Sequence, residues 1–228
     1  MDDTLIRYAR QLSHDLNNFT TVVRTYSELL LTELPAATST HADVAEIQRA
    51  AESMVQYLQR VTRFARASSM RRSPVAVDAG LEDAATTFQR LVASRPVAVT
   101  ATTNAFIGAE ATWWREVLAE LLQNAHEAAP AGAPIEVRAS TTPTHAVVEV
   151  RDTGPGFPSS LGNLGRPFVT TKSGVRGAGM GLALVTAFAA AQGGTVSFGR
   201  DGQETVVRLE LPLVAPQQVP EGSAPPQA

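Results

Sequence analysis

Residues 12–30 read LSHDLNNFTTVVRTYSELL, and this stretch decides the first half of the fold. Its apolar residues recur in alternating steps of four and three, the spacing of the seam of a packed helix. These are Leu12, Leu16, Phe19, Val23, Tyr26 and Leu30. At roughly 100° per residue they stay near one line, and His14 and Asn18 fall together on another side. The pattern therefore predicts a helix that buries the apolar stripe and exposes His14, with Asp15 beside it.

An exposed imidazole beside a carboxylate has the parts of a nucleophile, because the carboxylate can take a ring proton and fix the tautomer. Asn18, one turn further on, can hold a water molecule or an incoming carboxylate on the same face. The simpler interpretation is a surface histidine with polar neighbours. Segments further along the chain decide between these two interpretations.

The composition narrows the class of protein. The chain has 228 residues, a formal net charge of −3, 44% hydrophobic residues and no cysteine. That length allows one or two domains. The absence of a basic block argues against nucleic-acid binding, and the absence of cysteine excludes disulfides and cysteine-based zinc sites. We find no signal peptide and no apolar run long enough to cross a bilayer, so we expect a cytoplasmic protein without direct membrane insertion.

The first 70 residues read as a helical hairpin. We expect helices over 3–34 and 41–68, separated by Pro35 and a short polar connection over 36–40. One hairpin cannot bury the apolar seams of both helices, and a twofold dimer that makes a four-helix bundle is the simplest solution. We therefore expect residues 1–70 to form a homodimeric hairpin.

After a linker over 68–73 the pattern changes to short strands and helices, which predicts an α/β sandwich over 74–213 and an α+β chain overall. We expect strands at 75–77, 96–102, 135–140, 145–151, 195–199 and 205–211, and helices at 79–92, 111–129 and 182–191. Asp78 is the predicted N-cap of the first of these helices. Residues 214–228 are rich in Pro, Gln and Ala, and we expect them to be disordered.

Two segments of this second half carry chemistry. Glu120 and Asn124 lie one helical turn apart, and carboxylate and amide oxygens suit Mg²⁺ that is bound to phosphates. Asp152 ends a predicted strand, where a buried carboxylate can accept a hydrogen bond from an exocyclic amine such as that of adenine. Gly154 and Gly156 allow the tight turns that follow. The plainer interpretations are a polar helix face and a surface turn.

A third segment, 177–182, reads GAGMGL and opens a helix. Glycine amides at a helix N-terminus make a cradle for phosphate. No strand-turn-helix unit precedes it, so it is not a Rossmann fingerprint, and it lacks the ending of a Walker loop. Just before it, Phe168 could anchor a mobile lid, and Lys172 could reach a terminal phosphate.

In this order the motifs resemble those of the sensor histidine kinases of two-component systems, over about residues 5–213. HDLNN is similar to the H box, ELLQNA to the N box, and DTGPGF and GAGMGL to the two G boxes. The resemblance implies a dimerisation and histidine-phosphotransfer hairpin followed by the ATP-binding domain shared with gyrase, Hsp90 and MutL proteins. It implies ATP and Mg²⁺ as cofactors. The implied partners are a second copy, a response regulator receiver domain and a separate sensor protein.

The resemblance also implies roles for the H-box residues. His14 would be the phosphoacceptor, Asp15 the general base, and Asn18 the position linked to dephosphorylation of the regulator. The implied function is an ATP-dependent protein-histidine kinase that autophosphorylates His14 and passes the phosphoryl group to an aspartate of a response regulator. Phosphatase activity toward that regulator is a further expectation.

The nucleotide-site roles come from the same resemblance. Asn124 and Glu120 would hold Mg²⁺, and Asp152 would read adenine. The other implied nucleotide-binding residues are Gly154, Gly156, Phe168, Thr171, Lys172, Gly177, Gly179, Gly181 and Leu182.

The chain departs from the family pattern at several positions. Phe19 stands where many members have proline, and Glu127 stands where many have a basic residue. Gly165 and Arg166 replace the Phe and Glu that are frequent in the lid. The departure at Glu127 leaves the terminal phosphate more dependent on Lys172.

Three alternatives remain open. The first is a phosphotransfer hub with a degenerate ATP-binding domain, against which the intact Asn124, Asp152 and glycine set argues. The second is a serine kinase or ATPase of the same superfamily, which would not need the His14 hairpin. The third keeps the kinase fold but acts mainly as a phosphatase through Asn18.

Overall fold

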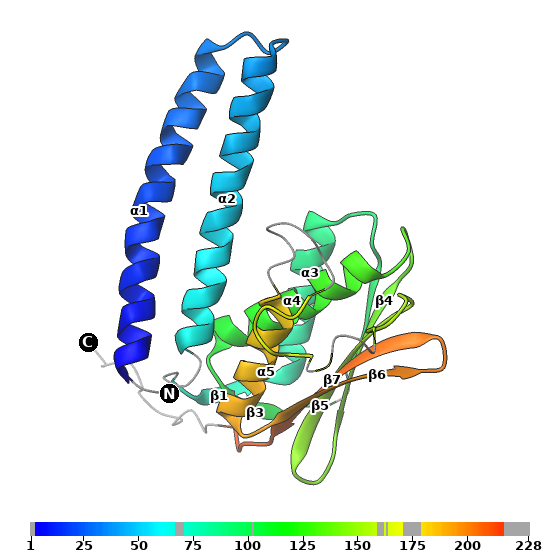
Figure 1. Ribbon diagram of the computed structural model, residues 1–228. Coiled ribbons are helices and arrows are strands. Elements are labelled where there is room, and N and C mark those ends of the chain that lie inside the picture. The colour runs from blue at the N-terminus through cyan, green and yellow to red at the C-terminus, as the bar shows by residue number, and fades with distance from the viewer. Residues whose placement is uncertain are drawn as a thin grey trace, which may run out of the picture.

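The computed structural model describes residues 3–66, 71–101, 103–158, 162, 164–170 and 179–216. Helices α1 (Asp3–Glu33) and α2 (Ser39–Arg66) form a long N-terminal hairpin. The following described residues form an α/β unit beside α2 (Figure 1). This arrangement confirms the predicted fold class. Residues 68–70 of the predicted linker and residues 217–228 of the predicted disordered tail lie outside the described residues.

Within residues 11–33 of α1, whose side chains are described, the residues buried in the hairpin are small and polar. Ser13, Thr20 and Ser27, one every seven residues, are each no more than 4% exposed. The hydroxyls of Thr20 and Ser27 donate to carbonyl oxygens one turn earlier in α1, and the Thr20 hydroxyl also contacts Met54 Sδ of α2 at 3.3 Å. The buried apolar residues of α2 are Val44, Ala51 and Leu58. The hairpin therefore has a thin apolar interior.

The apolar stripe of α1 is not buried within the single chain, and its predicted burial in a dimer stays a prediction. Five of its six members are exposed, with exposed fractions from 44% to 69%. These are Leu12, Phe19, Val23, Tyr26 and Leu30. The reason is that the serine and threonine face, and not the apolar face, is the buried one in the hairpin. We call the exposed set the α1 apolar row.

In the described part of the chain, the α/β unit is a five-stranded mixed sheet with three helices on one face (Figure 1). The strand order is β2-β4-β5-β7-β6, with β2 parallel to β4 and the other neighbours antiparallel. The strands are β2 (Val97–Ala101), β4 (Ile135–Thr141), β5 (His145–Asp152), β6 (Thr195–Asp201) and β7 (Glu204–Pro212). The helices are α3 (Val77–Leu91), α4 (Ala111–Ala128) and α5 (Gly181–Gln192).

The core lies between the helices and the sheet and determines where β5 presents its last residue. Val148 and Val150 belong to the core cluster, together with Trp114 and Phe188, whose rings stack at 5.9 Å. Because side chains alternate along a strand, Asp152 falls on the same, helix-covered face. The alternation of β5 therefore places a carboxyl group at the edge of the core.

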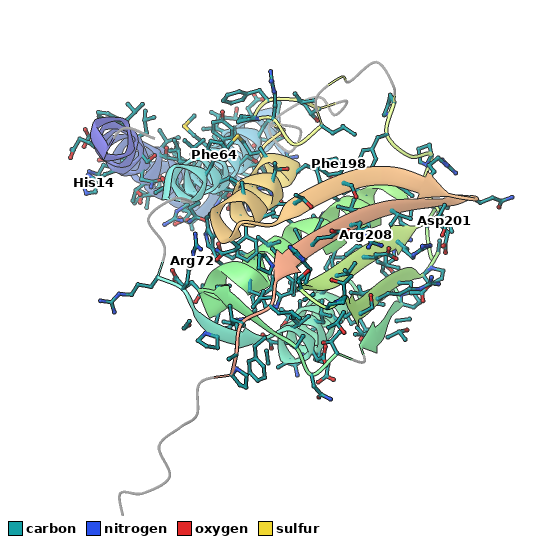
Figure 2. All side chains as sticks on the ribbon, turned by 90° about the horizontal axis from the view of Figure 1, so that it is seen from below. His14, Phe64, Arg72, Phe198, Asp201 and Arg208 are labelled. Carbon is teal, nitrogen blue, oxygen red and sulfur yellow. The ribbon has the colours of Figure 1, made fainter. Side chains whose placement is uncertain are left out.

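The other face of the sheet carries a charged network. Arg151 is 7% exposed and donates hydrogen bonds to Glu149, Asp201 and Glu204. Arg208 donates to Glu149 at 3.0 Å. Figure 2 shows Arg208 and Asp201 on this side. The network links β5, β6 and β7 next to Asp152.

The sequence did not predict a second, two-stranded sheet. Strand β1 (Ser73–Ala76) pairs in antiparallel orientation with β3 (Phe106–Ala109). β1 lies close to the predicted strand at 75–77, whereas no strand was expected at 106–109.

The prediction that Asp78 caps a helix is also wrong. α3 begins at Val77, two residues before the predicted start, and its N-cap Ala76 makes no side-chain hydrogen bond. The Asp78 carboxylate instead accepts hydrogen bonds from the backbone N–H groups of Thr103 and Asn104 and from the Thr103 hydroxyl. The carboxylate therefore ties the loop before β3 to α3, and a long-range contact has replaced the local one.

Two side chains of α2 dock the hairpin onto the α/β unit, and a third contact comes from Arg72, in the segment just before β1. Phe64 of α2 packs against the core cluster (Figure 2). Arg60 forms an ion pair with Glu120 of α4, and the Arg72 guanidinium donates to the Ala191 carbonyl oxygen of α5. Both views place α2 between α1 and the α/β unit (Figures 1 and 2).

Candidate functional site

A cleft of about 350 Å³ opens between α4, the end of β5 and the N-terminus of α5. This volume falls within the range of small-molecule sites, roughly 300–1,000 Å³. Residues from all three elements line it, and the hairpin contributes as well. The lining includes Arg60, Glu120, Asn124, Asp152, Gly179 and Gly181.

One end of the cleft is built around Asp152, which is 4% exposed. Its Oδ1 accepts a hydrogen bond from the Gly154 backbone N–H at 2.7 Å, and burial raises the pKa of its carboxyl group. A Cβ atom on Gly154 would lie 2.6 Å from Asp152 Oδ1 and 2.8 Å from the Ala128 carbonyl oxygen. Glycine is therefore required here, since the end of α4 and the end of β5 approach too closely for a side chain.

Two side chains fix the loop that follows Asp152. Arg200 Nη1 donates to the Pro155 carbonyl oxygen at 2.7 Å, and the Thr205 hydroxyl donates to the Gly154 carbonyl oxygen at 3.2 Å. Gly156 has φ +84°, a conformation that favours glycine. The loop is thus held open beside a buried acceptor, an arrangement suited to a flat ring with an exocyclic amine.

The other end of the cleft combines α4 with the start of α5. Glu120 and Asn124, one turn apart on α4, both line it, as the sequence predicts. Gly179, with φ +65°, and Gly181 stand at the α5 N-terminus. A Cβ atom on Gly181 would lie 2.8 Å from Glu120 Oε2. Glycine lets this carboxylate lie directly against the start of α5.

The donors at this end fit Mg²⁺ only together with a ligand. Among the described residues, no group of three or more His, Cys, Asp or Glu side chains could hold a metal ion by itself. One carboxylate and one amide oxygen, from Glu120 and Asn124, are the minimal protein set that Mg²⁺ uses when phosphates and water complete its octahedron. The residues therefore fit a metal that arrives with a phosphate ligand.

The other predicted nucleotide-binding residues divide into three groups. Gly156 and Leu182 line the cleft, and Gly154 supports its wall. Phe168 is 66% exposed and not in the lining, although its backbone N–H donates to the Gly179 carbonyl oxygen at 3.1 Å. The remaining three, Thr171, Lys172 and Gly177, lie outside the described residues.

The His14 side chain is 70% exposed on α1, as predicted. Its Nδ1 lies 3.3 Å from Asp15 Oδ1 and 3.5 Å from Asn18 Nδ2. Gln11 Nε2 donates to both Asp15 carboxylate oxygens, at 3.0 and 3.2 Å, and these hydrogen bonds together with the one from His14 lower the pKa of Asp15. A proton on Nδ1 that is donated to Asp15 leaves Nε2 with a free lone pair pointing to solvent.

His14 and the cleft are not brought together in this arrangement. The described lining includes Arg60 of α2 and no residue of α1. Figure 2 shows His14 on α1, with α2 between it and the α/β unit. For a group bound in the cleft to reach a histidine directly, either the α/β unit must change its position against α2, or the histidine must come from another copy of the chain.

The comparisons with known proteins agree with this geometry. Residues 109–215 match the family described as Histidine kinase-, DNA gyrase B-, and HSP90-like ATPase. Over 220 residues the chain is 26% identical to the sensor kinase CckA of Brucella abortus (strain 2308), a match that covers 88% of this chain and 23% of CckA. The chain is a relative of the sensor histidine kinases.

Other relatives extend the same result. The sensory histidine kinase/phosphatase NtrB of Azospirillum brasilense is 34% identical over 127 residues, which cover 48% of this chain and 31% of NtrB. The structure of full-length ShkA in complex with AMPPNP superposes with a TM-score of 0.74 at 24% identity, over 91% of this chain and 46% of ShkA, and shows the common fold. The chain spans about a quarter to a third of these curated relatives. Among its described helices, none has the length and apolar character needed to cross a membrane.

Sequence reasoning missed three residues of this histidine kinase relative that shape the cleft. Arg200 and Thr205 hold the loop after Asp152 from a strand pair some 50 residues later. Arg60 reaches the cleft from the hairpin. None of the three belongs to a motif, and only the tertiary fold brings them to the site.

Proposed function

We propose that this chain is an ATP-dependent protein-histidine kinase that autophosphorylates His14. The observation that carries the proposal is that one cleft gathers a buried acceptor for adenine, Asp152, and a phosphate-facing end with Asn124 and the α5 N-terminus. The same chain presents a solvent-facing imidazole oriented by Asp15. Each part has a place in one reaction, and the relatives are sensor kinases.

The chain's residues take the following roles in that reaction. Asp152 would accept a hydrogen bond from the adenine amine. Asn124 and Glu120 would hold Mg²⁺, which would supply positive charge to offset the negative charge that develops on the phosphates. His14 Nε2 attacks the γ-phosphorus in line. The N–P bond forms as the bond to the β–γ bridging oxygen breaks, and ADP leaves. Asp15 accepts the Nδ1 proton of His14.

This reaction also needs a division of the chain into parts that move. Residues 1–70 act as the dimerisation and phosphotransfer hairpin, and residues 74–213 act as the ATP-binding domain. The connection between them lets the domain leave α2 and approach a phosphoacceptor histidine. Catalysis is mainly positioning, so this motion sets the rate.

A homodimer is the state in which we expect the hairpin to work. The α1 apolar row is exposed along several turns, and the hairpin interior is too thin to compensate for that exposure. A second copy that covers the row would complete a four-helix bundle. Phe19→Glu should shift the protein toward monomer in sedimentation velocity, whereas Leu91→Glu, at an exposed site outside the row, should not. A Phe19→Glu protein that dimerises like wild type would contradict this interface.

Labelling with γ-³²P ATP tests the kinase activity. We expect an acid-labile, alkali-stable label on wild type, no label on His14→Ala, and strongly reduced label on Asn124→Ala. His41→Ala, which removes a histidine elsewhere in the hairpin, is the matched control and should label like wild type. Label that persists in His14→Ala, or that survives acid, would overturn the assignment.

The second half of the proposal is transfer to a partner. The phosphoryl group passes from His14 to an aspartate of a response regulator receiver domain that docks on the bundle, and a separate sensor protein supplies the signal. Asn18, at 3.5 Å from His14 Nδ1, is positioned to act in dephosphorylation of that regulator. Loss of label from purified phospho-protein when a receiver domain is added tests the transfer. Asn18→Ala should reduce regulator dephosphorylation while it leaves His14 labelling intact.

A further inference from the structure

Arg60 belongs to the hairpin, yet it lines the cleft of the α/β unit. Its Nε lies 3.0 Å from Glu120 Oε1, and the two side chains are only 26% and 14% exposed. Among the described residues this ion pair is the polar interaction that the guanidinium makes, and its terminal N–H groups form no hydrogen bond there. A largely buried arginine therefore keeps most of its donors available to the cleft.

The charges of the cleft make this arginine important. Glu120 and Asp152 bring two carboxyl groups to the described lining, and among the described lining residues Arg60 supplies a cationic side chain. A polyphosphate in such a site faces repulsion unless cations offset it. An arginine is suited to this role, because its planar fork forms charge-assisted hydrogen bonds with phosphate oxygens.

The position of Glu120 marks where an anion is favoured. Its Oε1 pairs with Arg60, and its Oε2 lies against Gly181 at the α5 N-terminus. A guanidinium and a helix N-terminus both attract negative charge. The Glu120 carboxylate therefore occupies an anion site formed by two other elements, one of which comes from the hairpin.

We propose that Arg60 is a nucleotide-phosphate ligand that the hairpin supplies to the cleft, and that it exchanges Glu120 for the terminal phosphates when a nucleoside triphosphate binds. This rests on the proposed ATP-dependent function and names a binding residue for it. The exchange also frees Glu120, one of the two residues that fit Mg²⁺. Phosphate affinity then depends on whether α2 is docked against the α/β unit.

Equilibrium binding to the full chain tests the proposal without measuring catalysis. ATP, ADP and adenosine are titrated in EDTA, and ATP again in Mg²⁺, with wild type and four variants. Arg60→Ala removes the side chain that is proposed to bind phosphate. Glu120→Gln frees Arg60 from its ion pair. The double variant separates the loss of Arg60 from the effect of leaving Glu120 without its partner. Arg49→Ala, which removes an exposed arginine paired with Glu46 on α2, is the matched control.

We expect Arg60→Ala to weaken ATP binding roughly tenfold or more, ADP binding less, and adenosine binding by less than about twofold. In EDTA, Glu120→Gln should bind ATP more tightly than wild type, because Arg60 is free and one negative charge is gone. In Mg²⁺ that advantage should shrink. Arg49→Ala should match wild type.

The double variant decides between direct contact and repulsion from an unpaired Glu120. If Arg60 contacts phosphate, Arg60→Ala/Glu120→Gln binds ATP roughly tenfold more weakly than Glu120→Gln alone. Equal affinity of these two proteins overturns the proposal, and so does an equal loss of ATP and adenosine binding in Arg60→Ala. If wild type binds neither ATP nor adenosine, the proposed kinase function itself fails, which is a different result.

Discussion

Replacing Arg95 with alanine should destabilise the α/β unit, although no carboxylate among the described residues accepts a hydrogen bond from this arginine. Arg95 is 4% exposed. It donates to His126 Nδ1 at 3.0 Å, to the carbonyl oxygens of Pro130 and Ala133 at 2.6 Å, and to those of His126 and Ala129 at 3.1 and 3.3 Å. The guanidinium therefore caps the C-terminal end of α4, where the helix dipole favours a positive charge. His126 accepts at Nδ1 and so carries its proton on Nε2.

The expected loss of unfolding free energy in Arg95→Ala follows from these five hydrogen bonds. Each contributes about 1 kcal/mol net, and part of this is regained because the alanine variant no longer buries a guanidinium. We expect the free energy of unfolding to fall by about 3 kcal/mol in Arg95→Ala. The end of α4 also carries the Ala128 carbonyl oxygen that packs against Gly154, so adenosine binding should weaken in the same variant.

Urea unfolding followed by circular dichroism measures the effect. Arg95→Lys keeps the charge but has three donors at most, so it should lose an intermediate amount of stability. Arg90→Ala, at an exposed position in the last turn of α3, should stay within about 0.5 kcal/mol of wild type. A loss below about 1 kcal/mol in Arg95→Ala, or full stability in Arg95→Lys, would refute the capping argument.

Three further predictions concern the cleft and the α1 surface. Because burial raises the pKa of Asp152, the folded state loses stability as pH rises from about 4 through that raised pKa. The Tm of Asp152→Asn relative to that of wild type should therefore rise over this pH range. A difference in Tm that stays constant with pH would contradict the prediction. Gly154→Ala should lower the free energy of unfolding in urea by about 1–3 kcal/mol and abolish adenosine binding, because its Cβ would overlap the Ala128 carbonyl oxygen at the end of α4. A Cβ at Gly199 would meet nothing within 4 Å, so Gly199→Ala should bind adenosine normally. Gln11→Ala should raise the pKa of Asp15 in an NMR titration, because the Gln11 hydrogen bonds help to lower it; an unchanged pKa would argue that they do not form in solution.

Periodicity in the sequence was sufficient to predict the two long helices and most strands of the sheet. It could not say which chain covers the apolar row of α1, because a heptad pattern identifies residues that need burial but not their partner. The buried face of α1 instead carries Ser13, Thr20 and Ser27, which are too small and polar to signal a core. The row's burial against a second copy stays a prediction.

The candidate site was predictable where its residues form local motifs and hidden where they do not. Glu120, Asn124 and Asp152 line one cleft, as their motifs indicate, although their roles remain predictions. The role of Asp78 could not be predicted from the sequence, because one carboxylate can accept hydrogen bonds from either a helix start or a distant loop, and only the fold decides between them. Arg60 had no sequence signal, since its partner lies 60 positions later.

The two ends of the cleft come from different parts of the molecule. The end around Asp152 is assembled within the α/β unit, from β5, α4 and the strand pair that carries Arg200. The opposite end includes a side chain of α2. An inhibitor that contacts only the Asp152 end would bind regardless of where the hairpin lies relative to the α/β unit. A longer inhibitor that reaches Arg60 would bind best when α2 is docked against that unit. Inhibitor length is therefore a practical means of selecting one position of the hairpin over another.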